Sequence, residues 1–431
     1  MNQNSFRFAY RTLPFLESYK GDPEGVLELR TQPPRRLLVW HPEGVDWIFR
    51  ADRRMRHVPS RTLSPLLGQT SLLWAEGPRH TAYRRVLGPA LHGPSLQARH
   101  HIISRTVHAA LDALVPGTVI SLIEWNRQVT LRVISQILLD RADDLLLRSF
   151  SARVDSALGS RTRTLAYRCL RASTAARLPF PNRHGELDRM LLRSARATAN
   201  YPSPALAALL LAGAEPIGAL EDHELIDQIM SLLFAGHETT ASATAWTLYW
   251  LSRDERVRRD VVAELSATSN DGSDPTQVPL LHAACHEALR LFPPAFIAGK
   301  RRLTASGELL GKSLAPGTIV TPCMYLAHHH PALFPNPHRF DPNRFLGKRI
   351  PHQYYFPFGG GTRRCLGSEL AMLEMRMITA AMLRRCELHC VNPEAGIPVL
   401  RGPAMTLSQD LRLSVTPHRW VSREPVRHRN G

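Results

Sequence analysis

The pattern of hydrophobic and polar positions divides the chain into three regions. Near the N-terminus, the stretches GVLELR and RRLLVWHP carry apolar, strand-forming residues between glycine and proline, which predicts strands of a small sheet. From about residue 79 to residue 265, apolar residues recur at helical spacing, which is typical of helices that bury one face. From Pro293 to Phe358 the chain is proline-rich and irregular, with strand-like pieces such as GTIVTPCMYL. The pattern predicts a mainly α-helical fold with small β-sheets (α+β).

Two helices are predicted with particular clarity. The first begins near Glu221 and includes LLFAGHETTASATAW, and a break near Ser252 separates it from a following helix. Because its middle is apolar on nearly every face, we expect it to be buried at the centre of the molecule. The second runs from about Ser368 to Cys386 and comes directly after a glycine-rich loop.

Length and composition favour one globular unit. The 431 residues are 44% hydrophobic and 21% charged without a compositional break, so we expect a single domain over 1–431 with frayed ends at 1–10 and 421–431. No apolar run is long enough for a transmembrane span, and we find neither a signal peptide nor a disulfide framework. These features predict a cytoplasmic protein.

The charge balance is strongly basic. Lys and Arg total 54 against 37 Asp and Glu, which gives a net charge of +17. The arginines are spread over the chain and no nucleic-acid motif accompanies them, so we expect no nucleic-acid binding. A solvated basic surface or an acidic protein partner explains the excess better.

The loop FPFGGGTRRCLG places a single cysteine among arginines and glycines. Glycines allow the backbone to approach a flat group closely, and neighbouring arginines and a following helix N-terminus lower the pKa of a thiol. A purely structural Cys365 would leave Arg363 and Arg364 unexplained. The loop therefore predicts a reactive or ligating thiolate at Cys365.

The segment AGHETT puts polar groups inside the long apolar helix. Buried polar groups are costly unless they are paired, so Glu238 and Thr239 indicate a functional cavity. Two explanations stay open from the residues alone: a proton relay, or a helix kink in which the hydroxyl bonds back to the preceding turn. Zinc protease chemistry is excluded because Ala241 stands at the second histidine position of His-Glu-x-x-His.

Two further pairs have helical spacing. Glu287 and Arg290 share one helical face, where an isolated pair would stabilise the helix by only about 0.3 kcal/mol. His80 and Arg84 also share a face, which suits an anionic ligand such as a carboxylate, although a solvated basic face has the same pattern. Arg344 follows in FDPNRF.

These four motifs, in this order, resemble those of the cytochromes P450. The loop matches the family pattern Phe-Gly-x-Gly-x-Arg-x-Cys-x-Gly at every position, with Phe358, Arg363, Cys365 and Gly367 at four of the fixed places. The resemblance implies that Cys365 ligates haem iron and that Thr239 and Glu238 deliver protons to bound dioxygen. It also implies a haem-propionate site and a structural triad that secures the cysteine loop. The propionate residues would be His80, Arg84, Arg363 and Arg301, the last only slightly preferred over Lys300, and the triad would be Glu287, Arg290 and Arg344.

The resemblance further implies a fold and an activity. The fold would be the P450 fold, with haem b (iron protoporphyrin IX) between the long central helix and the cysteine loop. The protein would be a haem-thiolate monooxygenase that inserts one oxygen atom from O2 into a hydrophobic small molecule of terpenoid, polyketide or fatty-acyl type, in secondary metabolism. An acidic ferredoxin would supply electrons to a monomeric enzyme. A peroxide-driven enzyme and a haem protein that binds ligand without turnover remain as alternatives.

Overall fold

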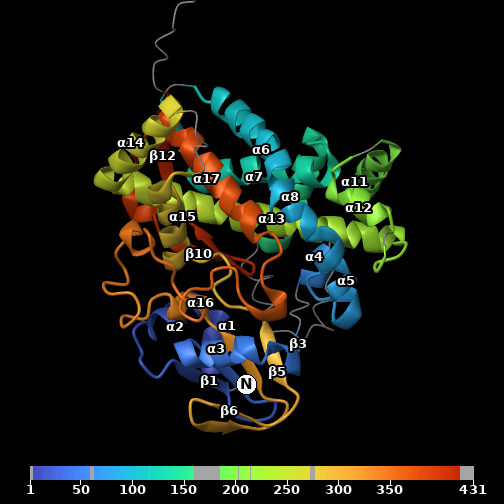
Figure 1. Ribbon diagram of the computed structural model, residues 1–431, viewed down its shortest axis with the longest axis vertical. Helices are drawn as coiled ribbons and strands as arrows, with labels where there is room; N and C mark the ends of the chain where they lie inside the picture. Colours follow the sequence, from blue (N-terminus) through green and yellow to red (C-terminus); the bar gives the residue numbers. More distant parts are fainter. Residues whose placement is uncertain are drawn as a thin grey trace, which may run out of the picture.

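A long helix, α13 (Asp222–Arg253), runs through the middle of the molecule (Figure 1). Most of its side chains are buried, as its apolar sequence predicts, and it packs along α7 (Leu122–Leu139) and against α15, α17 and β11. It ends before Asp254, whose side chain accepts a hydrogen bond from the Val257 amide (3.0 Å) at the start of α14 (Glu255–Asp271). The predicted break between two helices is therefore confirmed.

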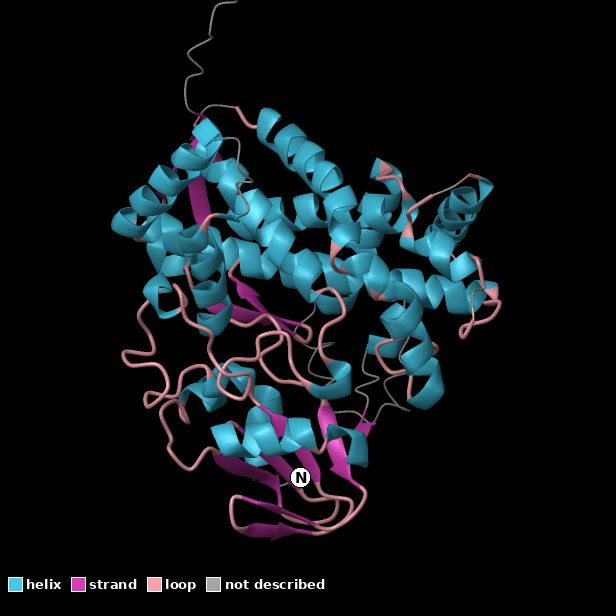
Figure 2. Ribbon diagram, in the orientation of Figure 1, coloured by secondary structure: helices cyan, strands magenta, loops and turns pink. Residues whose placement is uncertain are grey.

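The computed structural model describes residues 3–58, 63–115, 117–159, 185–201, 203–213, 215–271 and 277–417. Helices dominate this part of the chain, which confirms the mainly α prediction (Figure 2). Besides α7, α13 and α14, the helices are α1 (Gln3–Tyr10), α2 (Thr12–Glu17), α3 (Pro42–Arg50), α4 (Ser64–Leu67), α5 (Gly77–Leu87), α6 (Pro94–Asp112), α8 (Asp144–Leu158), α11 (Glu186–Ala197), α12 (Leu206–Leu211), α15 (Pro279–Leu291), α16 (Met324–Ala327) and α17 (Ser368–Arg385).

The strands form small sheets, as the alternating apolar stretches predict. The largest has the order β1-β2-β8-β5-β3, and a three-stranded sheet has the order β4-β12-β9. β6 pairs with β7 and β10 with β11. The strands are β1 (Val26–Arg30), β2 (Arg36–Val39), β3 (Met55–Val58), β4 (Thr118–Ser121), β5 (Lys300–Leu303), β6 (Gly307–Leu309), β7 (Lys312–Leu314), β8 (Ile319–Pro322), β9 (Cys386–Cys390), β10 (Pro398–Arg401), β11 (Ala404–Leu407) and β12 (Arg412–Pro417).

Two hydrophobic clusters form the cores of the two parts of the molecule. One is built by the helices around α13, and the other packs α2 and α3 against the five-stranded sheet. The helical part lies in the upper half of Figure 1 and the sheet in the lower half. The loop that carries Cys365 lies where these parts meet, directly before α17.

The structure bears on two features predicted from the sequence, the ends of the chain and the lack of a transmembrane span. Of the ends that we expected to fray, residues 3–10 form α1, and residues 421–431 lie outside the described residues. Within the described ranges, no helix has the length and apolar character needed to cross a membrane.

Candidate functional site

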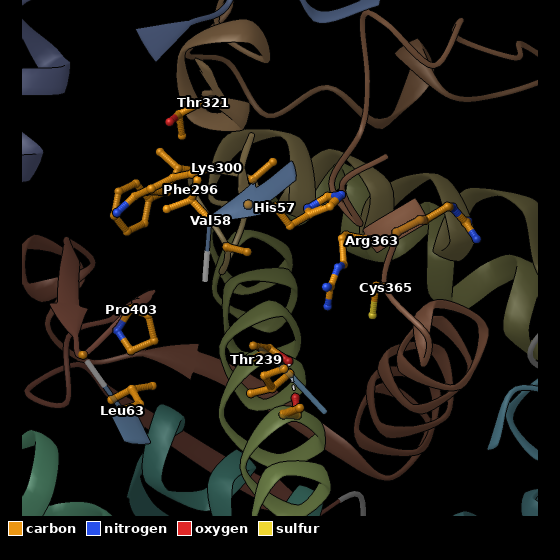
Figure 3. Close-up of a pocket in the computed structure, with 18 of the residues that line it drawn as sticks. His57, Val58, Leu63, Thr239, Phe296, Lys300, Thr321, Arg363, Cys365 and Pro403 are labelled. Carbon is orange, nitrogen blue, oxygen red and sulfur yellow. Dashed lines mark hydrogen bonds between the residues drawn. The ribbon is translucent and has the colours of Figure 1, made fainter. Parts of the chain in front are cut away.

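A cavity of about 1440 Å³ lies between the helical part and the five-stranded sheet. Its wall includes Cys365 from the loop before α17 and Thr239 from α13, which Figure 3 shows on different sides of the space. Other lining residues come from α1, α5, β2, β5 and β8. Segments from the whole length of the chain therefore meet at this one cavity.

The cysteine loop is held in a conformation that requires glycine. Gly359 and Gly361 both have φ of +68°, a region that favours glycine, and a Cβ on Gly361 would lie 2.5 Å from the carboxyl carbon of Asp52. The Cys365 amide donates to the carbonyl oxygen of Phe358 (2.9 Å), which closes the loop. Gly367 then precedes the first residue of α17.

The Cys365 side chain faces the cavity, although protein atoms surround it on its other sides. Burial raises the pKa of this thiol, and the Gly367 amide, Arg364 and Arg84 offset part of that effect. The protein groups alone therefore do not make Cys365 a thiolate, and a bound metal ion would supply the missing stabilisation of the anion.

Asp52 anchors the loop from the N-terminal part of the chain. Its carboxylate accepts hydrogen bonds from the Thr362 amide (2.7 Å) and from Nε of Arg301 (2.8 Å). Burial alone would raise the pKa of Asp52, but hydrogen bonds from His57, Thr362 and Arg301 outweigh it and lower that pKa strongly. Arg301 also donates to the Gly360 carbonyl oxygen (2.8 Å). Arg301 thus faces the loop, whereas its neighbour Lys300 is the residue that lines the cavity.

Three basic groups line the cavity near the cysteine. His80, Arg84 and Arg363 all contribute to the wall, and none of them forms an ion pair with a carboxylate in the described ranges. Burial, together with the positive charges of Arg363 and Arg84, lowers the pKa of His80 to about 4. Burial also lowers the pKa values of both arginines. Two guanidiniums without a carboxylate partner there, beside an imidazole that can donate a hydrogen bond, fit an anionic ligand.

The structure separates the predicted pair of Thr239 and Glu238. Thr239 lines the cavity and donates from Oγ1 to the Ala235 carbonyl oxygen (2.7 Å), so both explanations left open by the sequence remain compatible with its position. Glu238 is fully buried outside the cavity wall, where Nη2 of Arg127 lies 2.6 Å from its Oε1 and Arg401 binds its other oxygen. Burial disfavours the charge on Glu238, but the two arginines more than offset this and lower its pKa.

The structure brings the predicted triad together. Arg290 and Glu287 are fully buried and form a bidentate pair, with distances of 2.7 and 2.8 Å. Nε of Arg344 lies 3.3 Å from the same Glu287 carboxylate. Arg290 also donates to the carbonyl oxygen of His328 (2.8 Å), and Nε2 of His328 accepts from the amide of Phe356 (3.0 Å), the first residue of the cysteine loop. The triad is therefore connected to the loop through one residue.

Sequence reasoning missed several residues of this site. Asp52, Arg127 and Arg401 act through partners more than a hundred residues away, and no local spacing reveals such contacts. Glu374 is different, because an acid within the apolar pattern of α17 is itself a signal. It lines the cavity at 1% exposure, burial raises its pKa well above the usual range, and its Oε2 has no hydrogen-bond partner among the described residues.

Comparison with known proteins identifies the family. The cytochrome P450 family model matches residues 14–416, so the chain belongs to the cytochrome P450 family. Two relatives from Streptomyces melanosporofaciens are each 30% identical to it. Cyclooctat-9-en-7-ol 5-monooxygenase aligns over 88% of this chain and 86% of its own length, and cyclooctatin synthase over 93% and 90%.

Solved structures agree on the fold. Retinoic acid-bound cyanobacterial CYP120A1 superposes with a TM-score of 0.80 at 23% identity, over 94% of this chain and 95% of the other. The haem domain of cytochrome P450DA gives the same TM-score at 20% identity, over 96% and 94%. The protein has the P450 fold and is a haem-binding monooxygenase of the oxidoreductase class; its family holds haem through a cysteine thiolate and uses O2 and a redox partner.

The residues around the cavity fit this cofactor. Iron protoporphyrin IX is a flat apolar macrocycle with an axial position for a soft ligand and two carboxylates at one edge. The cavity offers a thiol at Cys365, the imidazole of His80 and two cations, Arg84 and Arg363, that form no ion pair with a described carboxylate. In the described ranges, no group of three or more His, Cys, Asp or Glu side chains is placed to hold a metal ion.

Proposed function

We propose that this protein is a monooxygenase in which the Cys365 thiolate would hold the haem iron and the Thr239 hydroxyl would hold or pass a proton on another side of the same cavity. The observation that carries the proposal is the position of these two residues on different sides of one cavity, beside His80 and the cations Arg84 and Arg363, which have no carboxylate partner in the described ranges. When bound, the haem would supply dioxygen activation, which an electron-rich thiolate ligand favours. His80, Arg84 and Arg363 would hold its propionates.

The two members of the predicted proton relay would act differently. Thr239 faces the cavity, and rotation of its hydroxyl away from Ala235 would let Oγ1 donate a hydrogen bond into it. Glu238 would connect this helix to solvent, because Arg401 joins it to Asp155, which is exposed on the surface. To pass a proton toward the cavity, the Glu238 carboxylate would have to break its ion pair with either Arg127 or Arg401.

Arg301, Phe358 and Gly367 would shape the haem site without binding the propionates directly. Arg301 would fix the Gly360 carbonyl, and Phe358 would fix the Cys365 amide through its carbonyl oxygen. The triad of Glu287, Arg290 and Arg344 would hold the chain before the loop. These roles keep the thiol of Cys365 directed into the cavity.

The substrate would be a hydrophobic small molecule, because the cavity wall beyond the cysteine is mainly apolar. Two relatives bear names that connect them to the cyclooctat-9-en-7-ol and cyclooctatin reactions, which supports a role in secondary metabolism. We also propose a cytoplasmic monomer that receives electrons from an acidic ferredoxin. Each cysteine in the described ranges is free, which suits a reducing compartment.

The absorption spectrum of the reduced, carbon monoxide-bound protein tests this function. We expect the thiolate-type Soret band in the wild type and in Cys390→Ser, a control at a buried cysteine of β9. Cys365→Ser should lose this band, and Cys365→His should bind haem with an imidazole-type spectrum if serine prevents loading. A thiolate-type band that persists in Cys365→Ser would rule out the assignment. Turnover with hydrogen peroxide but not with ferredoxin, reductase and NADPH would favour the peroxide-driven alternative.

A further inference from the structure

One row of the five-stranded sheet is almost entirely cationic. The strand register aligns Arg30 with Arg36, Arg36 with Ile319, Ile319 with Arg302 and Arg302 with Arg56. Directly paired residues on neighbouring strands point to the same face of a sheet. Four arginines therefore project from one face in a single row, and like charges placed this way repel each other.

The next row along the strands lies on the same face. Leu38 pairs with Thr321, and Lys300 pairs with Val58, each two residues from a member of the arginine row. Because side chains alternate along a strand, a shift of two residues returns to the same face. All four of these residues line the cavity, so this face of the sheet is a wall of the cavity and Lys300 extends the cationic row toward its interior.

These cations have no carboxylate partner in the described ranges of the chain. Ion pairs there involve neither Arg30, Arg36, Arg302 nor Lys300, and the nearby Glu28 is paired with Arg35 (2.5 Å). Burial and then the charge of Arg36 lower the pKa of Lys300. Burial lowers the pKa of Arg36 most, and the positive charges of Arg30 and Arg302 lower it further. The protein thus maintains an uncompensated positive potential along this wall.

An apolar path connects this wall to the haem site. Figure 3 shows Lys300, Phe296 and Thr321 together at an end of the cavity away from Cys365. Phe296, Ile297 and Leu232 contribute apolar surface to the same cavity, which also includes Thr239. A ligand that spans the cavity would therefore meet positive charge at one end and an apolar environment along its length.

We propose that the substrate is an amphipathic carboxylic acid, whose carboxylate lies against Arg36 and Lys300 while its apolar body extends past Phe296 toward Thr239 and Cys365. Guanidinium and ammonium groups bind carboxylates by charge-assisted hydrogen bonds, and Arg36 keeps its charge at any physiological pH. The inference rests on the proposed function, because it takes the space beside Cys365 as the place of oxidation. It adds that the oxidised carbon lies far from the carboxyl group.

Matched acid and alcohol ligands test this inference. We would titrate the haem-loaded protein with hexadecanoic acid and hexadecan-1-ol, and with retinoic acid and retinol, by calorimetry and by the spin-state change of the haem. We expect at least one acid to bind about tenfold tighter than its alcohol, as a charged hydrogen bond predicts. This preference should fall as salt rises, because Arg36 is exposed and its charge is screened.

Charge-neutralising variants should remove the preference. Arg36→Gln and Lys300→Gln should each weaken acid binding by about threefold and leave alcohol binding unchanged, and the double variant should bind both alike. Lys312→Gln, on the exposed hairpin of β6 and β7, is the matched control and should retain the full preference.

The outcomes separate this inference from the proposed function. Equal binding of acid and alcohol, or failure of both acids to bind, overturns the carboxylate inference even when the reduced spectrum is of the thiolate type. Loss of haem content in Lys300→Gln also overturns it, because Lys300 would then belong to the propionate site. A wild-type protein without the thiolate-type band contradicts the proposed function instead, and calorimetry would still show whether the acid is preferred.

Discussion

At the scale of single residues, Glu374 is the clearest case of a buried acid without a partner charge. Its side chain lies at 1% exposure in the cavity wall, and burial raises its pKa well above the usual range. Burial therefore favours the protonated carboxyl group in the folded protein, whereas the unfolded chain loses this proton near the ordinary pKa of 4.5. Above that pH the unfolded state binds fewer protons, so folding stability falls as pH rises toward the folded pKa.

Substitution of this residue should remove that pH dependence. We expect Glu374→Gln to gain stability over the wild type with increasing pH, by up to about 1.4 kcal/mol per pH unit between pH 5 and the folded pKa. Urea unfolding of both haem-loaded proteins at pH 5, 6, 7 and 8 measures the difference. Parallel stability curves across this range would show that Glu374 is ionised in the fold.

The residues that the sequence predicted are those whose chemistry is encoded locally. Cys365 and the pair of Glu287 and Arg290 stand at fixed short spacings, and the structure places them in the cavity wall and in a buried pair. Glu238 and Thr239 are adjacent on a helix, and adjacent side chains point about 100° apart. Adjacency alone does not decide which of them faces the cavity, since the adjacent Thr239 and Thr240 both line it. The burial of Glu238 follows from its contacts with Arg127 and Arg401, which local spacing does not reveal.

At the scale of elements, Glu238 joins three of them. It lies on α13 and binds Arg127 of α7 and Arg401 of β10, while Arg127 also pairs with Glu124. Glu238 is fully buried and Glu124 is 46% exposed. Removal of a buried charge leaves its partners uncompensated, whereas an exposed ion pair contributes little.

Two substitutions by glutamine, Glu238→Gln and Glu124→Gln, compare the buried and the exposed ion pair of Arg127. We expect Glu238→Gln to lower the free energy of unfolding by about 3–5 kcal/mol. Arg127 and Arg401 would lose their buried counter-ion and keep only the more exposed carboxylates of Glu124 and Asp155. Glu124→Gln should cost less than about 1 kcal/mol. Denaturant unfolding of the haem-loaded variants measures both values. Equal losses would mean that burial does not determine the strength of this network.

The elements themselves were predictable to different degrees. The bounds of α13 and α17 agree with the sequence pattern within a residue or two, because long apolar helices have a strong periodic signal. The parallel pairing of β2 with β8 was not predictable, since about 280 residues separate the strands and nothing local encodes their contact. That pairing creates the cationic wall of the cavity, so the proposed carboxylate site could not be found from the sequence.

At the scale of the whole molecule, positively charged side chains also gather at a second place, next to the cysteine loop. A separate hollow of about 760 Å³ is lined by Arg349, Arg364 and Arg376 together with the loop residues Phe358 and Gly359. Among the described residues, Glu369 is the only acid in this lining, and its carboxylate accepts a hydrogen bond from the Gly93 amide (3.1 Å). An acidic protein docked here would lie next to the loop that carries the haem ligand.

Reversal of these charges tests whether an acidic ferredoxin docks on this surface. Arg349→Glu and Arg364→Glu, both at exposed positions, should each slow reduction of the haem by a [2Fe–2S] ferredoxin by about tenfold at low salt, because complementary charge mainly accelerates association. The dependence on ionic strength should also become shallower. Lys312→Glu, on the hairpin at the far end of the molecule from α17, should change neither quantity (Figure 1). Stopped-flow reduction under carbon monoxide measures both, and the docking surface would have to lie elsewhere if the two arginine variants behaved like the control.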